Sequence, residues 1–207
     1  MIEHFAWTAH PTRDGDTELA LLAASPTTEV DTVAAVLAAH PVVREPRNRI
    51  RAALANSDAA YPSDPYRLYR LGGAGHHTQH DLAAALTVHQ LATDPLWGGL
   101  LDRIVFLAEL GLDGSLRPRL PAHAIAAVAA VAARAEFRYA VTAPPTDSTG
   151  LGPVDGITVV SPTDLRGVLD WLDSLTSDPP APTTASPAVT VGGDADPDGL
   201  SSDAEDR

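Results

Sequence analysis

The sequence predicts a mixed fold of helices and strands, α+β or α/β, around one core. Segments with helical spacing of apolar residues alternate along the chain with short apolar runs. An Asp113-Gly114 pair between two such runs indicates a β-hairpin. The 207 residues, of which 44% are hydrophobic, suffice for one domain of ordinary size and a tail. This order of elements does not fit a helix bundle.

Five helices follow from apolar spacing and from residues that favour helix ends. Pro46 suits the first turn of one helix, Asp81 opens another, and Pro121 opens an Ala/Val-rich one. Ser161, followed by Pro162 and Asp164, predicts the N-terminal cap of the last helix. The predicted helices run from Thr28 to Ala39, from Arg47 to Asn56, from Asp81, from Pro121 to about Glu136, and after Ser161.

The strands are predicted from short apolar or alternating runs between turn residues. The flexible sequence from Gly72 to Gly75 ends one of them, and the Asp113-Gly114 turn follows another. The predicted strands are Thr17 to Ala24, Tyr66 to Leu71, Arg103 to Leu110, Ser115 to Arg117, Tyr139 to Ala143 and Ile157 to Val160.

Composition divides the chain into a domain and a tail. Residues 1–176 are predicted to form the domain, with residues 40–173 as its best-supported part. Residues 177–207 are rich in Pro, Ser, Thr and Asp and are predicted to be a disordered acidic tail. The formal net charge of −13 repels phosphate backbones, which disfavours direct nucleic-acid binding by the whole surface.

The remaining bulk features indicate a cytoplasmic protein. No run of apolar residues is long enough to cross a membrane, and the first residues lack the pattern of a secretory signal. The absence of Cys excludes disulfides and thiolate metal sites. We therefore expect a soluble protein with no membrane partner.

All 14 Lys+Arg residues are arginines, so the chain has no lysine. Arginine cannot lose its proton at accessible pH, whereas lysine can and then acts as a base. The Walker A motif, G-x-x-x-x-G-K-[ST], also requires a lysine that reaches the terminal phosphates. The 207 residues therefore hold neither this nucleotide-binding loop nor a lysine base.

Three stretches together resemble a known family. They are Val43 to Ser57 (VREPRNRIRAALANS), Asp81 to Leu86 (DLAAAL) and Val105 to Pro118 (VFLAELGLDGSLRP). In order and spacing they are similar to motifs of the N-terminal domain of ComM/YifB proteins, also described as the magnesium-chelatase ChlI-like subunit domain. The resemblance covers roughly residues 40–173, and its third stretch is the most specific.

The resemblance implies a two-layer α+β fold like that of Lon protease and of a ribosomal small-subunit protein domain, with helices covering one side of one mixed sheet. In the family, this domain normally precedes an AAA+ ATPase. Lon enzymes use a Ser–Lys dyad. The resemblance places its lysine near Leu120 to Ala124, where His123 is the one base, and its serine just before Asp81. No serine occurs between Ser63 and Ser115, so this peptidase chemistry is excluded.

Arg44, Arg47, Arg49 and Arg51 form the most concentrated basic segment and are candidate contacts for an acidic partner or an anion. The alternative is a solvated helix face that Glu45 partly compensates. No aromatic residue interleaves these arginines in the sequence, so stacking of single-stranded nucleic acid is not indicated here.

His76, His77, His80 and Asp81 stand together and are candidate ligands of zinc or nickel. The alternatives are a solvated loop in which Asp81 caps the helix, and an acid–base site. The Gly-rich approach favours the solvated loop.

These observations favour a non-enzymatic interaction domain without a cofactor. Its expected partner is a second copy of itself or a separate AAA+ ATPase, and kinship implies a setting in DNA processing or uptake. The alternative is a metal-binding protein or an enzyme that uses the cluster from His76 to Asp81. A third alternative is an unselected remnant of a longer gene.

Overall fold

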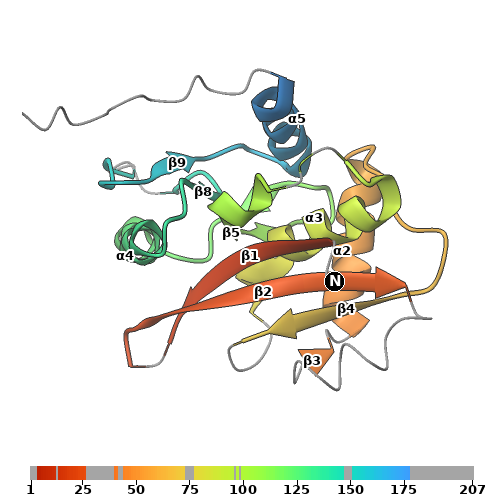
Figure 1. The fold of residues 1–207 in the computed structure, drawn as a ribbon, viewed down its shortest axis with the longest axis horizontal. Coiled ribbons are helices and arrows are strands. Elements are labelled where there is room, and N and C mark those ends of the chain that lie inside the picture. The colour runs from red at the N-terminus through yellow and green to blue at the C-terminus, as the bar shows by residue number, and fades with distance from the viewer. Residues whose placement is uncertain are drawn as a thin grey trace, which may run out of the picture.

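The computed structural model describes residues 4–12, 14–26, 40–41, 44–72, 77–95, 97, 99–146 and 151–177. The helix predicted from Thr28 to Ala39 lies outside these residues, as do His76 and most of the tail. Figure 1 shows four helices gathered around one twisted sheet in the described part.

The sheet has seven strands in the order β3-β4-β2-β1-β5-β8-β9. The pairs among β3, β4, β2 and β1 are antiparallel, whereas β1, β5, β8 and β9 pair in parallel, so the sheet is mixed. A separate hairpin pairs β6 with β7. The strands are β1 (His4–Pro11), β2 (Thr17–Pro26), β3 (His40–Pro41), β4 (Tyr66–Leu71), β5 (Ile104–Leu107), β6 (Glu109–Leu110), β7 (Leu116–Arg117), β8 (Tyr139–Thr142) and β9 (Thr158–Val160).

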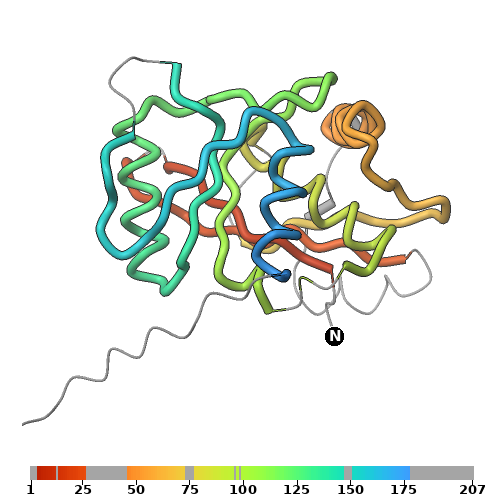
Figure 2. Tube along the Cα trace, turned by 90° about the horizontal axis from the view of Figure 1, so that it is seen from above, coloured from red at the N-terminus to blue at the C-terminus, as the bar shows by residue number. Residues whose placement is uncertain are grey.

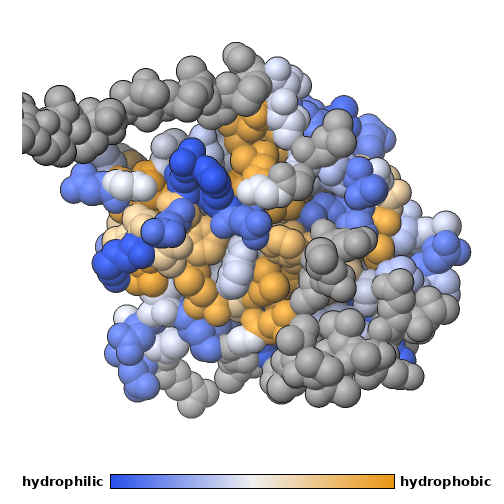
Figure 3. Space-filling view, viewed as in Figure 1, coloured by the Kyte–Doolittle hydropathy of each residue, from blue (hydrophilic) through white to orange (hydrophobic). Residues whose placement is uncertain are grey.

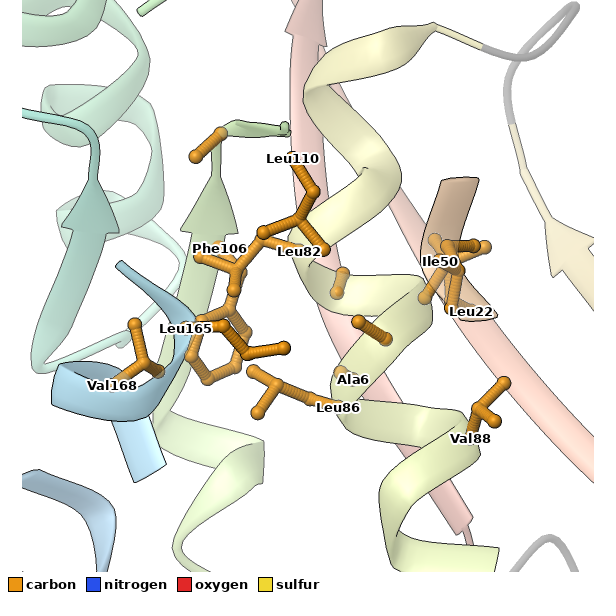
Figure 4. Packing of buried hydrophobic residues seen from close by; sticks show 14 of the residues in the cluster. Ala6, Leu22, Ile50, Leu82, Leu86, Val88, Phe106, Leu110, Leu165 and Val168 are labelled. Atoms are coloured by element: carbon orange, nitrogen blue, oxygen red, sulfur yellow. The ribbon is translucent and has the colours of Figure 1, made fainter. Parts of the chain in front are cut away.

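Helix α3 (Asp81–Thr93) is the centre of the main core. Its residues from Asp81 to Val88 are all buried, as expected for a helix that is apolar on every side. The helix packs against β1, β2 and β5 and against α2 (Arg44–Asn56). Figure 4 shows Leu82 and Leu86 of α3 near Phe106 of β5 and Leu165 of α5 (Leu165–Ser177).

Helix α4 (Ala122–Arg134) packs on the opposite face of the sheet. Along β5, Ile104 and Phe106 join the core around α3, whereas Val105 and Leu107 join a second core with α4, because successive side chains of a strand point to opposite faces. The resemblance implies helices on one side of the sheet only. The structure corrects this expectation, because α4 covers the opposite face. In the view from above in Figure 2, α4 lies to one side of the sheet, well apart from α2.

The predicted α+β class, with helices packed on one mixed sheet, is confirmed. The helix and strand predictions within the described residues are also confirmed, apart from shifts at the ends and a break at Ala108 between β5 and β6. The predicted cap of α5 is wrong in its residue. Asp164, not Ser161, accepts the backbone N–H of Gly167 at 2.8 Å, because the helix begins three residues later than that prediction placed it.

Strand β1 is central in the sheet, yet the sequence did not predict it. Ala6 of β1 belongs to the core around α3, whereas Trp7 and Ala9 belong to the core with α4. The small alanines allow the helices to approach closely, but they also weaken the hydrophobic signal on which strand prediction depends. On the face shown in Figure 3, apolar residues form a central band bordered by polar and charged ones.

Within the described part of the chain, no helix is both long and apolar enough to cross a membrane.

Candidate functional site

Helix α2 presents its arginines on two different faces. Successive helical residues are about 100° apart, so Arg47 and Arg51 share a face and Arg49 lies on another. Arg47 is stacked on Tyr66, 5.0 Å from the ring centroid, and it donates to the Tyr66 backbone oxygen at 3.0 Å. Arg51 lies 5.5 Å from the centroid of Tyr61, and the two tyrosine hydroxyls are 2.8 Å apart. We call Arg47, Arg51, Tyr61 and Tyr66 the arginine–tyrosine surface.

Within the part of the chain that the structure describes, no carboxylate pairs with the positive charge of this surface. Among the described residues, neither Arg47 nor Arg51 is within ion-pair distance of an acidic side chain. Burial and the hydrogen bond with Tyr61 raise the pKa of Tyr66, so its hydroxyl stays neutral at physiological pH. A hollow of about 290 Å³ adjoins the two rings, and Pro26, Pro62, Pro65 and Leu91 are among the residues that line it.

The third described arginine of the predicted group points inward. Arg49 Nε donates to Asp81 Oδ2 at 2.7 Å, and the side chains of Arg49 and Asp81 are 16% and 0% exposed. Asp81 is therefore not the solvated helix cap of the alternative interpretation, since its carboxylate is fully buried in an ion pair. The side chain of Arg44 lies outside the described part.

A second ion pair lies beside the first. Glu109 of β6 accepts a hydrogen bond from Arg119 Nε, and the Thr78 hydroxyl is close enough to favour its charged form. Burial alone would raise the pKa of the Glu109 carboxyl, but the polar groups of Thr78 and Arg119 and the charges of Arg119 and Arg49 outweigh it, so the pKa is lowered. We call Arg49, Asp81, Glu109 and Arg119 the ionic cluster. It joins α2, the start of α3 and the hairpin.

The three stretches that carry the family resemblance contact one another around this cluster. Asn56, at the end of α2, donates to the Leu112 backbone oxygen in the hairpin turn at 2.7 Å. Gly114 has φ +84°, and a Cβ there would overlap the Ser57 hydroxyl. The hairpin turn is thus seated on the end of α2, and only glycine satisfies both the backbone angle and the contact.

A hollow of about 300 Å³ opens between α2 and the hairpin. Asn48, Arg49, Glu109 and Arg117 contribute polar groups to its lining. Leu112 at its rim is 61% exposed and is the one large apolar side chain so exposed among the described residues. The ionic cluster therefore reaches solvent along this side.

Two of the predicted metal ligands instead pack against a histidine from β1. The rings of His10 and His77 are stacked at 4.4 Å between centroids, and His80 lies 5.2 Å from His10. Burial, and then the neighbouring His77, lower the pKa of His10, although Glu18 opposes this effect. The described residues contain no group of three or more His, Cys, Asp or Glu placed to hold a metal. Because His76 is outside the described part, the metal hypothesis stays a prediction.

The positions that the resemblance assigns to a Ser–Lys dyad hold other groups. Thr78 precedes α3, and its hydroxyl helps to lower the pKa of Glu109. His123 lies exposed in the first turn of α4. Without a lysine, the threonine has no base of the Lon type.

A family model described as subunit ChlI of Mg-chelatase matches residues 25–145. The chain belongs to the ChlI family. No curated protein matches it. The match contains all three resembling stretches, and in this ChlI-type domain they supply Arg49, Asp81 and Glu109 of the ionic cluster and the contact between the hairpin turn and α2.

The sequence did not reveal two parts of the site. The tyrosines that stack on Arg47 and Arg51 lie outside α2, so a search for aromatic residues between the arginines missed them. A helical projection would have separated Arg49 from Arg47 and Arg51. No local signal links His10 to His77, because β1 is far from that segment in the sequence.

Proposed function

We propose that this ChlI-type domain is a non-catalytic interaction module that pairs with a separate AAA+ ATPase or with a second copy of itself. The setting that kinship suggests is DNA processing or uptake. The observation that carries the proposal is that the charged groups of the ionic cluster are engaged with one another in ion pairs. Asp81 and Glu109 are held by Arg49 and Arg119, and no lysine is present to act as a base.

The arginine–tyrosine surface is the proposed partner contact. Arg47 and Arg51 lie on aromatic rings, which fix the guanidinium groups, and among the described residues neither has a carboxylate partner. Arginine and tyrosine are also enriched among the residues that dominate binding energy at interfaces. An acidic segment of the partner would meet both features.

This proposal is tested by affinity purification of the protein from a lysate of the cells that naturally produce it. We expect the full chain to retain an AAA+ ATPase or a second copy of itself, identified by mass spectrometry and light scattering. The Arg47→Gln/Arg51→Gln variant should lose that partner. The matched Arg134→Gln/Arg138→Gln variant, which changes two exposed arginines at the end of α4 and just after it, should keep it.

Two results would contradict the proposal. One is a protein that remains monomeric and retains no ATPase under all conditions. The other is intrinsic turnover of ATP or peptide by the purified chain that a point substitution such as Thr78→Val abolishes.

A further inference from the structure

The two edges of the seven-stranded sheet differ in what protects them from pairing with another chain. The outermost strands are β3, which consists of His40 and Pro41, and β9, which lies at the margin of the sheet in Figure 1. Pro41 has no N–H to donate, and proline is one of the residues that protect strand edges. β9 (Thr158–Val160) contains neither a proline nor a charged residue. Its sequence therefore leaves the β9 edge suited to pairing.

The backbone of Val159 points away from the sheet. In the parallel pair of β8 with β9, the Thr158 N–H donates to the Arg138 backbone oxygen at 2.9 Å. Alternate residues of such a strand turn their N–H and C=O groups to opposite sides, so those of Val159 face the open edge. The Ile157 N–H, which faces the same way, donates to the Val154 oxygen at 3.4 Å across a tight turn. Within the described ranges, no group donates to or accepts from the backbone of Val159.

Apolar side chains continue to this edge on both faces of β9. Val159 packs against the core with α4, whereas Val160 packs against the core around α3, and both are only partly buried. Trp171 of α5 and Tyr139 of β8 are also partly buried members of the core around α3, with ring centroids 5.4 Å apart. A strand added beside β9 would therefore remove apolar surface from water on both faces as well as pair the Val159 backbone.

We propose that β9 is a self-association surface, at which the β9 strands of two copies pair antiparallel about a two-fold axis. With Val159 opposite its own counterpart, the N–H of each residue donates to the C=O of the other. The two β-branched side chains then lie side by side on the face toward α4, which is a favourable pair across strands. Because a three-residue edge offers few hydrogen bonds, we expect weak and reversible association.

A second copy fits this edge better than an unrelated extended segment. An unrelated segment would match the backbone alone, whereas a second copy also supplies the β-branched neighbour for Val159. The uncharged edge further limits the repulsion between two chains that each carry a net charge of −13. The inference goes beyond the proposed function, because β9 and the strand β4 that carries Tyr66 lie toward opposite ends of the sheet.

The exchange rates of two neighbouring amides in the full chain test this pairing. NMR would measure their exchange with solvent at about 50 μM and at about 1 mM, a range in which weak interfaces associate. We expect the Val159 amide to exchange several-fold more slowly at the higher concentration. The Thr158 amide, which is bonded to Arg138 in each copy, is the control within the same strand and should not change. Sedimentation velocity over the same range should show monomer converting to dimer.

Two substitutions at one position separate the backbone from the side chain. Val159→Pro removes the outward N–H without removing a hydrogen bond to β8, so the dimer should be lost while the urea midpoint changes little. Val159→Thr keeps both the N–H and the β-branched shape, so the dimer should persist. The exchange measurement on the parent chain decides the question even if the proline variant does not fold.

Three results would overturn the inference. One is a monomer at all concentrations with an unchanged Val159 exchange rate. Another is slow exchange of Val159 at every concentration, which would mean that its own chain covers the edge. The third is a dimer that survives Val159→Pro or that Arg47→Gln/Arg51→Gln abolishes, because such a dimer is built on another surface. No ATPase enters these measurements, so their failure is distinguishable from failure of the proposed function.

Discussion

Replacing Arg49 with leucine tests whether the ionic cluster holds the domain together. The substitution leaves the Asp81 carboxylate, which is 0% exposed, without the guanidinium that now lies 2.7 Å away. Removing one partner of a buried ion pair costs about 3–5 kcal/mol, because the remaining charge stays buried and loses the opposite charge of that partner. This is a large part of the ~5–15 kcal/mol by which domains of this kind are stable.

The loss is measurable by urea unfolding followed through the fluorescence of the three tryptophans. With a slope of about 2 kcal/mol per molar urea, a loss of about 4 kcal/mol lowers the midpoint by roughly 2 M. The Arg166→Leu variant is the matched control, because Arg166 and Asp170 pair at 3.2 Å with side chains that are 58% and 65% exposed. We expect that control to change stability by less than about 1 kcal/mol.

The decisive variant adds Asp81→Asn to Arg49→Leu. An amide carries no charge, so the double variant should be more stable than Arg49→Leu alone, although Asp81→Asn by itself should destabilise the protein. Such a reversal of sign is the signature of a direct interaction in a double-mutant cycle. If Asp81→Asn lowers stability equally in both backgrounds, the two residues act independently and the reasoning about the cluster fails.

Three further predictions concern the hairpin seat and the histidines. Gly114→Ala should lower the free energy of unfolding in urea by more than Gly15→Ala. Both glycines have positive φ, but only a Cβ at position 114 would overlap the Ser57 hydroxyl. Equal losses of stability would contradict the packing of the hairpin turn on the end of α2. Burial lowers the pKa of His10 and His89, so the native state binds fewer protons than the unfolded chain, and the urea midpoint should fall as pH decreases below about 6.5. The midpoint of the His10→Gln variant should fall less than that of the parent chain. An equal fall would show that His10 does not contribute to the pH dependence. Metal analysis of the tag-free protein should find no stoichiometric zinc or nickel, because Asp81 is held by Arg49; a full equivalent that is lost in His77→Ala would contradict this.

Local sequence patterns were sufficient to predict those helices and turns that depend only on neighbouring residues. Helix α3 follows from its apolar run after Asp81, and the hairpin follows from Asp113-Gly114. The hydrogen bonds that fix that turn are also local, since Asp113 accepts both the N–H and the hydroxyl of Ser115. Such signals need only a few neighbouring residues, so one sequence reveals them.

The contacts that define the candidate site are of another kind. Arg49 and Asp81 come from different helices, and either residue read alone suits a solvated position. Their ion pair exists because α2 packs on α3. No local sequence pattern predicts that packing. The sequence analysis named Arg47, Arg49, Arg51 and Asp81 among its candidates, but not the residues that contact them, and it placed Arg49 on the same face as Arg47 and Arg51 and favoured a solvated Asp81.

The separation of the arginines has a consequence for function. Arg49 is committed to Asp81, so its charge contributes to the stability of the fold, while Arg47 and Arg51 keep theirs on aromatic rings at the surface. One face of α2 thus packs on the core, and another face lies at the surface. A partner can engage Arg47 and Arg51 without disturbing the ionic cluster. For this reason, substitutions of Arg47 or Arg51 should alter binding with little loss of stability, whereas substitutions of Arg49 should do the opposite.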